Sequence, residues 1–236
     1  MSKFALITGG SRGIGKAIAY YFAQQGYSLI LVSLNKETLN QTKLAIQAKY
    51  PSCDIETVSV DFKKPTDVES SIKSIIDKHN SIDVMVNSAG VLMAGHINLT
   101  LNQLSELINV NLLSTITACN LVIEKMTEQG HGEIYNIGST AGLEPVPKIA
   151  AYSATKAAIV SYSQSLYQEL LPLGIKVCCL CPSVVDTDMT NDGRIMNNLK
   201  IETQDLTKAI DFIRSLSLCA SLPTLSIRCK TIDLEK

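Results

Sequence analysis

The sequence predicts an α/β fold: one doubly wound, mostly parallel sheet of about seven strands with helices on both faces. Three observations lead to this prediction. Short apolar runs alternate with segments of helical periodicity, the first run leads into a glycine-rich turn, and 46% of the 236 residues are hydrophobic. Repeated strand–helix units require a parallel sheet joined by right-handed crossovers. The length fits a single domain over residues 1–236.

The first predicted unit is a strand at 4–7, a glycine-rich turn at 8–15 and the helix that follows it. The strand is a short apolar run of the kind that a parallel sheet buries on both faces. This arrangement directs backbone N–H groups and the positive end of the helix towards a phosphate. Gly9 suits a tight turn, Gly13 lets a pyrophosphate approach, and Gly15 lets helix and strand pack closely. A glycine-rich turn without a ligand is the alternative interpretation.

Prolines and small residues mark the next elements, up to residue 90. Pro51 ends one helix and Pro65 opens another, because proline fits the first turn of a helix but not its interior. The small residues at 87–90 follow a strand and let a loop pass close to a ligand. The elements predicted in this part are strands at 28–32, 55–60 and 84–86 and helices at 37–50 and 65–79.

Beyond residue 90 the alternation continues to a last strand. Thr100 and Gln103 have the spacing of a capping box, which opens the helix that carries Asn111. A polar loop with scattered apolar residues at about 188–203 is the expected substrate loop. A Rossmann-type sheet of this kind has its ligand crevice at the carboxyl ends of the strands. The remaining elements are strands at 134–137, 176–181 and 224–229 and helices at 151–171 and 204–218.

Composition and charge argue against several classes of function. The net charge is −1 and no basic block stands out, so nucleic acid is not an expected partner. No apolar stretch approaches the roughly 18 residues of a membrane helix, and the N-terminus leads directly into a strand without a signal peptide. The seven cysteines are an odd number without metal-ligand spacing, so we expect reduced core thiols and no metal site. These features predict a cytoplasmic protein.

A phenol and an ammonium group stand four residues apart, at Tyr152 and Lys156, and so share one helix face. Tyrosine titrates near 10, and a nearby cation lowers that pKa. Alone, such a pair is more often an exposed contact than a catalytic one. Ser139 lies 13 residues upstream of Tyr152, just after a strand, where its hydroxyl can hold a substrate oxygen. Asn111 has a plain alternative role, as a buried amide that ties a helix to the backbone.

Together these motifs resemble the short-chain dehydrogenase/reductase family. The glycine turn, Asn87-x-Ala89-Gly90 and the four residues Asn111, Ser139, Tyr152 and Lys156 occur in the family's order and spacing, over residues 4 to about 218. The resemblance implies that Tyr152 gives a proton to a carbonyl oxygen or removes one from an alcohol. It also implies that Lys156 lowers the pKa of Tyr152 and bonds the nicotinamide ribose. Ser139 would orient the carbonyl, and Asn111 would hold the water that refills the proton relay.

The resemblance further implies a nicotinamide cofactor and a small carbonyl or alcohol substrate, the substrate being bound by Ser139 and Tyr152. Two departures from the family stand near the site and at the tail. Ser183 replaces the usual Gly after Pro182, and residues 231–236 lack the Asp-Gly-Gly ending. The implied cofactor-binding residues are Gly9, Ser11, Arg12, Gly13, Ile14, Gly15, Ser33, Asp61, Phe62, Asn87, Ala89, Gly90, Tyr152, Lys156, Pro182, Val185 and Thr187.

The end of the second strand favours NADP(H) over NAD(H). A site for NAD holds the ribose 2′-OH with an Asp or Glu about 20 residues past the glycine turn. Here Ser33 and Leu34 stand at that point, without a carboxylate. Arg12 matches a family position where a basic residue meets the 2′-phosphate, and Lys36 adds a second charge. Leu34 stands where many NADP-using relatives carry another arginine, and a solvated turn residue is the alternative role for Arg12.

The predicted function is therefore the NADP-dependent reduction of a ketone or 3-oxoacyl carbonyl to an alcohol. The alternatives are a catalytically silent NADP-binding sensor or scaffold and a purely structural partner protein. The helices at 102–129 and 151–171 resemble those that pair in family dimers, so a homodimer or homotetramer is expected. The expected apolar walls of the substrate pocket, besides the loop at 188–203, are Val91, Leu92, Met93, Leu143, Pro145 and Val146.

Overall fold

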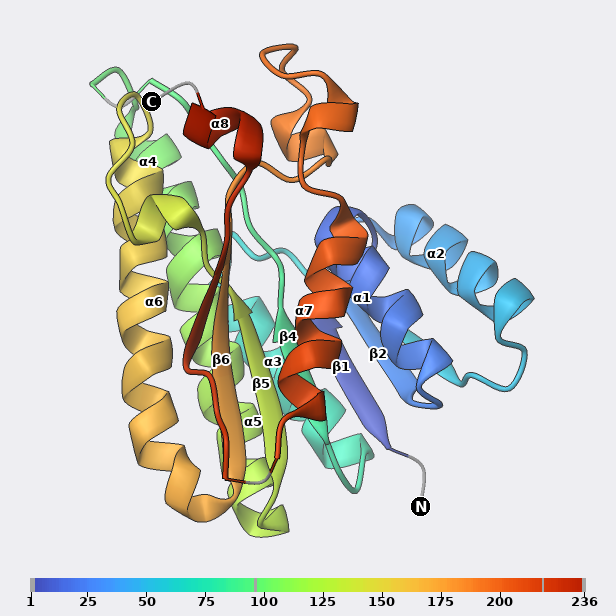
Figure 1. The fold of residues 1–236 in the computed structure, drawn as a ribbon. Coiled ribbons are helices and arrows are strands. Elements are labelled where there is room, and N and C mark those ends of the chain that lie inside the picture. The colour runs from blue at the N-terminus through green and yellow to red at the C-terminus, as the bar shows by residue number, and fades with distance from the viewer. Residues whose placement is uncertain (1–2, 96, 218, 235–236) are drawn as a thin grey trace.

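Within the residues that the structure describes, 3–95, 97–217 and 219–234, seven strands form one sheet. In this computed structural model every neighbouring pair of strands is parallel, in the order β3-β2-β1-β4-β5-β6-β7 (Figure 1). The predicted doubly wound sheet is confirmed. The strands are β1 (Phe4–Thr8), β2 (Ser28–Ser33), β3 (Ile55–Ser59), β4 (Val84–Asn87), β5 (Gly132–Ile137), β6 (Ile175–Pro182) and β7 (Thr224–Ile227).

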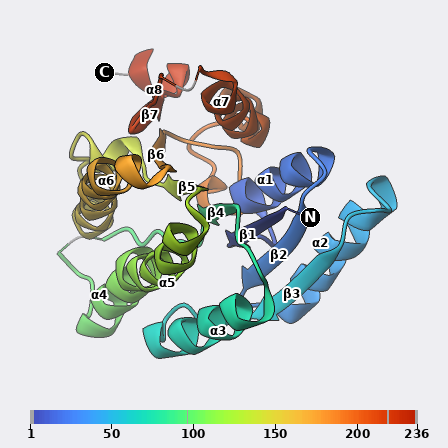
Figure 2. The same cartoon turned by 90° about the horizontal axis from the view of Figure 1, so that it is seen from below.

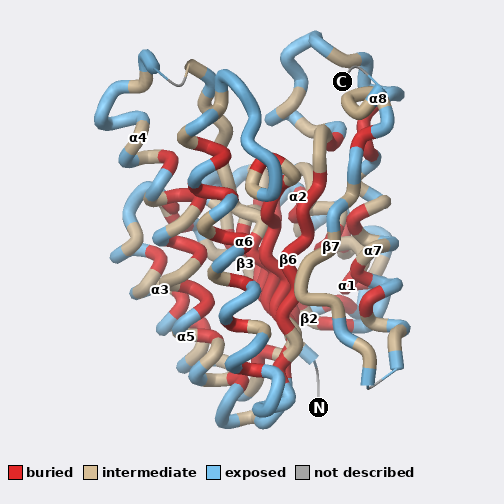
Figure 3. The backbone as a smooth tube through the Cα atoms, turned by 60° about the vertical axis from the view of Figure 1, so that its left-hand side comes forward, coloured by how far each residue is buried: buried red, intermediate tan, exposed pale blue. Residues whose placement is uncertain are grey.

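Helices cover both faces of the sheet (Figure 2). One face packs against α1, α2 and α7 around Phe22, and the other packs against α3, α5 and α6 around Ile72. The buried residues concentrate on the strands between these layers (Figure 3). The helices are α1 (Gly13–Gln24), α2 (Lys36–Lys49), α3 (Pro65–Lys78), α4 (Leu101–Ile108), α5 (Ser114–Gln129), α6 (Ala150–Leu170), α7 (Thr203–Ser215) and α8 (Lys230–Leu234).

The helix that follows β4 opens at the predicted capping box and is interrupted in its middle. Gln103 N–H donates to the Thr100 hydroxyl, and the Gln103 side chain accepts from Thr100 N–H. A π-helical turn at Asn109–Leu113 then separates α4 from α5. Such turns are frequent at functional sites, and this one carries Asn111.

Together α4, the π-helical turn and α5 form one helical segment, Leu101–Gln129, which corrects one expectation from the sequence. The helix has 29 residues and contains a window of 18 that is apolar enough to cross a membrane by length and composition alone, although no apolar stretch of that kind was expected. Cys119, Val122 and Met126 on its inner face are fully buried in the core beneath the sheet. Burial accounts for 44% of the apolar window, and the core helix of a globular domain passes the same test.

The carboxyl-terminal part departs most from the predicted elements. Helix α7 ends at Ser215, because Leu216 adopts an extended backbone, and the predicted end at Leu218 lies outside the described residues. Strand β7 ends at Ile227 and is followed by α8, which the sequence did not predict. The loop at 188–203 contains two short 3₁₀ turns. The carboxyl-terminal part therefore adds a helix beside the expected substrate loop.

Most of the cysteines are buried in the core. All seven cysteines are free thiols, and all but Cys219 are buried. Among the described residues, no group of three or more His, Cys, Asp or Glu side chains could hold a metal ion.

Candidate active site

The glycine turn is built so that side chains cannot fit at two of its positions. Gly9 has a φ of +66°, and a Cβ there would lie 2.8 Å from Ala89 N, in the loop after β4. A Cβ on Gly15 would lie 2.3 Å from the Gly9 carbonyl oxygen. Gly13, with a φ of +53°, approaches the side chain of Thr187 after β6. The turn therefore brings the ends of β1, β4 and β6 together.

The N-terminus of α1 faces this turn without a side-chain cap. Arg12 occupies the N-cap position and makes no side-chain hydrogen bond to the first turn, which also lacks acidic residues. Free N–H groups and the positive end of the helix macrodipole form an anion site. The turn is thus suited to a phosphate group by its backbone alone.

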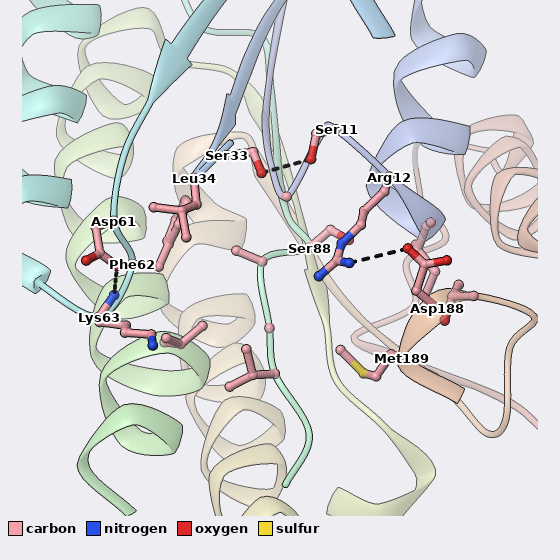
Figure 4. A pocket seen from close by; sticks show the side chains of 18 residues that line it. Ser11, Arg12, Ser33, Leu34, Asp61, Phe62, Lys63, Ser88, Asp188 and Met189 are labelled. Atoms are coloured by element: carbon pink, nitrogen blue, oxygen red, sulfur yellow. Dashed lines mark hydrogen bonds and ion pairs between the residues drawn. The ribbon is translucent and has the colours of Figure 1, made fainter. Parts of the chain in front are cut away.

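A cavity of about 220 Å³ extends from the glycine turn across the carboxyl ends of β2, β3 and β4 (Figure 4). The residues Leu34, Lys63, Ser88, Val110, Asp188 and Met189 also line it, although the sequence did not assign them to the cofactor. Leu34, Lys63, Ser88 and Asp188 directly adjoin predicted cofactor-binding residues, whereas Val110 lies in the helix turn beside the predicted catalytic residue Asn111. The predicted residues that line it are Gly9, Ser11, Arg12, Gly13, Ile14, Ser33, Asp61, Phe62, Ala89, Gly90 and Thr187.

Polar contacts hold two edges of this first cavity (Figure 4). The hydroxyl oxygens of Ser11 and Ser33 lie 2.9 Å apart in a hydrogen bond, where the end of β2 meets the glycine turn. Arg12 Nη1 lies 3.3 Å from Asp188 Oδ2, and both side chains are about three-quarters exposed, at 72% and 74%. The arginine that we expected to meet a phosphate is therefore paired with a carboxylate of the loop after β6.

A second cavity, of about 320 Å³, adjoins the first. Ile14, Gly90 and Thr187 line both cavities, so a ligand can extend from one to the other. The predicted residues that line the second cavity are Ile14, Gly90, Leu92, Ser139, Pro145, Val146, Tyr152, Lys156, Pro182, Val185 and Thr187.

Tyr152 and Lys156 project from α6 into this second cavity. Burial raises the pKa of Tyr152 above its usual value, and a hydrogen bond with Ser139 lowers it in part. Lys156 Nζ donates to the Ile137 carbonyl oxygen at 2.7 Å and lies 5.8 Å from the centre of the Tyr152 ring. Burial lowers the pKa of Lys156 to about 8. The ammonium group thus faces the ring of Tyr152 and is not among the causes of its pKa shift.

Asn111 joins the loop after β4 to the helix that carries Tyr152. Its Oδ1 accepts from Val91 N–H at 2.8 Å, and its Nδ2 donates to the Val91 carbonyl at 2.9 Å and to Thr155 Oγ1 at 3.2 Å. A Cβ on Gly90 would lie 3.4 Å from Asn111 Oδ1 and 3.8 Å from Lys156 Nζ. The side chain therefore has the plain role of tying a helix to the backbone, while it lies beside Lys156.

Several predicted residues line neither cavity, and the predicted catalytic residue Asn111 is one of them. The Asn87 amide donates to Asn136 Oδ1 at 2.9 Å and to Cys119 Sγ at 3.1 Å, within the core. Gly15 lies beneath the turn, against Gly9. Of the expected pocket walls, Met93 and Leu143 line neither cavity, while Val91 lines the first. Asn87 and Gly15 therefore support the frame of the site from behind.

Charged residues from the loops after β5 and β6 and from the segment around α8 complete the second cavity. Glu144, Arg194, Arg228 and Asp233 line it together with Ile232. The sequence reasoning did not assign any of these five to the site. Arg194 lies in the predicted substrate loop, but the others lie before α6 or around α8, where no motif marks them.

Comparison with known proteins places this geometry in context. A sequence model of the short chain dehydrogenase family matches residues 3–198. An uncharacterised oxidoreductase of Staphylococcus epidermidis is 36% identical over 209 residues, which cover 88% of this chain and 89% of that protein. The 3-oxoacyl-(acyl-carrier-protein) reductase of Chlamydia trachomatis is 35% identical over 203 residues, covering 86% and 81%. A short-chain dehydrogenase from Sphingobium yanoikuyae in complex with NADPH superposes with a TM-score of 0.83 at 27% identity, covering 96% and 87%.

Proposed function

The chain belongs to the short chain dehydrogenase family of oxidoreductases, and we propose that it reduces a ketone or 3-oxoacyl carbonyl to an alcohol with NADPH. One observation carries this proposal. Tyr152, whose ring lies beneath the Lys156 ammonium group, lines a cavity together with Ser139, and this cavity shares lining residues with the cavity at the glycine turn. The proposed proton donor therefore lies in a cavity next to the proposed dinucleotide site.

The first cavity fits a nicotinamide dinucleotide. The uncapped start of α1 and the close contacts of Gly9 and Gly15 leave room for a pyrophosphate against the backbone. At the edge of β2, Ser33 and Leu34 bring no carboxylate that would repel a 2′-phosphate, and Arg12 supplies a cation. The NADPH complex of the Sphingobium relative supports the same choice. When bound, NADPH supplies the hydride, and the protein positions the reaction and supplies the proton.

The side chains around the second cavity have different proposed roles in the reaction. A raised pKa keeps the Tyr152 hydroxyl protonated at neutral pH, so that it can donate its proton to a carbonyl oxygen. Ser139 lines the same cavity and its hydroxyl can donate to the same carbonyl oxygen. Lys156 is fixed to the Ile137 carbonyl over the Tyr152 ring, where its ammonium group can bond the ribose of the nicotinamide. Asn111 joins the π-helical turn to the loop after β4 and to α6 through its side-chain hydrogen bonds.

A direct assay tests this proposal and its alternative. Purified protein is mixed with NADPH and a panel of ketones and 3-oxo esters, and NADPH consumption is followed, while binding of NADPH is measured by its fluorescence. We expect consumption with at least one carbonyl compound and the matching alcohol as product. Binding of NADPH without turnover of any compound would favour the catalytically silent sensor instead.

Assembly and location remain predictions. We propose a homodimer or homotetramer, because Leu101, Ile108 and Leu113 expose apolar side chains on the helix that resembles the family's pairing helix. Sedimentation at micromolar protein should show a particle larger than the 25.6 kDa chain. A particle of that mass alone would contradict the proposed assembly. A cytoplasmic location is likewise proposed, and fractionation of cells would test it.

A further inference from the structure

The last described helix, α8, lies beside the mouth of the cavity that holds Tyr152. Ile232 and Asp233 of α8 and Arg228, just before the helix, line this cavity. Figure 1 shows α8 at the carboxyl-terminal end of the sheet, between the loop that follows β5 and the loop that follows β6. The contacts that hold α8 in place therefore help to set the width of the cavity.

Contacts on two sides hold the segment that contains α8. On one side, Arg228 Nη1 donates to Glu144 Oε1 at 2.9 Å, in the loop after β5. On the other side, Thr231 Oγ1 and Cys229 Sγ donate to the Leu199 carbonyl oxygen at 3.0 and 3.4 Å, in the loop after β6. The segment thus joins the two loops that flank the cavity.

Arg228 is the centre of the first contact. Its Nε and Nη2 each donate to a different carboxylate oxygen of Asp233, both at 2.7 Å, while Nη1 bonds Glu144. Exposed ion pairs usually contribute little, but bidentate geometry and linked pairs are the conditions in which they contribute measurably. Lysine could not make these three bonds in one plane, because it lacks the planar fork of arginine.

We propose that Arg228 is a specificity-determining residue: by clasping α8 to Glu144 it narrows the substrate cavity and selects compact carbonyl compounds over those with a long chain. The cavity of about 320 Å³ stands near the lower end of the roughly 300–1,000 Å³ typical of small-molecule sites. A longer substrate has to displace α8, and the clasp opposes that displacement. This inference rests on the proposed reduction of a carbonyl group.

The test compares variants on one reaction with tails of different length. Wild type, Arg228→Gln and Glu144→Lys are assayed with 3-oxobutanoate esters from ethyl to decyl, with NADPH consumption as readout. Lys230→Gln is the matched control, because it removes one positive charge beside the clasp from an exposed residue that does not line the cavity. In parallel, amide hydrogen exchange is measured in α8, where Asp233 N–H donates to the Cys229 carbonyl.

We expect Arg228→Gln and Glu144→Lys to raise the decyl-to-ethyl ratio of kcat/KM by about threefold to tenfold, mainly through KM, and to speed exchange in α8. Lys230→Gln should leave both readouts within about twofold of wild type. A ratio that does not change in either clasp variant overturns the proposal. If wild type reduces no ester at all, the proposed function fails with these substrates. Hydrogen exchange in α8 then tests the clasp by itself. Exchange rates equal to those of wild type overturn the clasp, and faster exchange in both clasp variants supports it.

Discussion

The two cavities of the site are built from different parts of the polypeptide. The first is shaped by the backbone: Gly9 and Gly15 leave no space for a Cβ, and the uncapped start of α1 supplies the N–H groups. The second is shaped by side chains, with Tyr152 and Lys156 almost fully buried against the loop after β5. The shape of the glycine turn is set by its backbone and depends little on the neighbouring side chains. The shape of the second cavity depends on each side chain that packs around it.

The two cavities also hold their cations differently. Lys156 is 6% exposed and bonded to a backbone carbonyl, so burial controls its titration. Arg12 is largely exposed and paired with Asp188, so solvent screens it. Substitutions in the second cavity should therefore have large effects on chemistry, and those at the edge of the first should have small effects on selectivity.

The largest expected effect is that of Tyr152→Phe. The change removes one oxygen and the only proton donor that we propose for the carbonyl. We expect kcat/KM to fall by about 10²–10⁴-fold, with NADPH binding nearly unchanged. Tyr162→Phe is the control, because its hydroxyl lies on the same helix but bonds Asn120 at the surface. Retention of more than about a tenth of the wild-type kcat/KM would remove Tyr152 from this role.

Gly15→Ala tests the backbone cradle. The new Cβ would lie 2.3 Å from the Gly9 carbonyl oxygen, so that the turn has to shift. We expect NADPH affinity to fall by on the order of a hundredfold and the free energy of unfolding by about 1–3 kcal/mol. Gly26→Ala is the control, since a Cβ there meets nothing within 4 Å and only the positive φ is strained. NADPH titration and denaturant unfolding would measure both, and an unchanged affinity would contradict the proposed cradle.

The same contrast explains how much the sequence could predict. The sheet and the residues around the glycine turn follow from local patterns, because a glycine at a tight turn and an apolar strand each act within a few residues. Asn87 shows where prediction from local patterns ends. The motif marks this residue, but the hydrogen bond from its amide to Asn136 depends on the pairing of β4 with β5. Helix α8 and the Arg228–Glu144 contact join positions 84 residues apart, and no local pattern encodes such a pair.

The titration of Lys156 gives the next effect. Burial lowers its pKa in the folded protein to about 8, below the ordinary value of 10.5, so the unfolded chain binds more protons between these two pH values. The free energy of unfolding should therefore rise with pH in that window, because the cost of burying a charged ammonium is lost as the group deprotonates. Relative to Lys156→Met, without nucleotide, we expect a gain of about 2 kcal/mol from pH 8 to 10.

Denaturant unfolding of both proteins at several pH values checks this expectation. Titrations of groups away from Lys156 occur in both proteins and cancel in the difference, whereas Cys179, whose pKa Lys156 helps to lower, contributes to it. A difference that stays constant across the window would show that Lys156 keeps its charge above pH 8 in the folded protein.

The smallest expected effect concerns the choice of nucleotide at the exposed edge of the first cavity. Arg12 lines that cavity, and the contact between a guanidinium and a phosphate is charge-assisted and can be bidentate. In the structure Asp188 holds the same guanidinium, so a 2′-phosphate has to compete with a carboxylate. Arg12→Ala should raise KM for NADPH by about threefold to tenfold and leave KM for NADH unchanged.

Asp188→Asn should act in the opposite direction and strengthen NADPH binding by about twofold, because it releases the arginine from its competitor. Measuring kcat/KM with both nucleotides for wild type and the two variants separates these effects. Equal loss of NADPH and NADH in Arg12→Ala would mean that the arginine supports the turn as a whole and that the 2′-phosphate is recognised elsewhere.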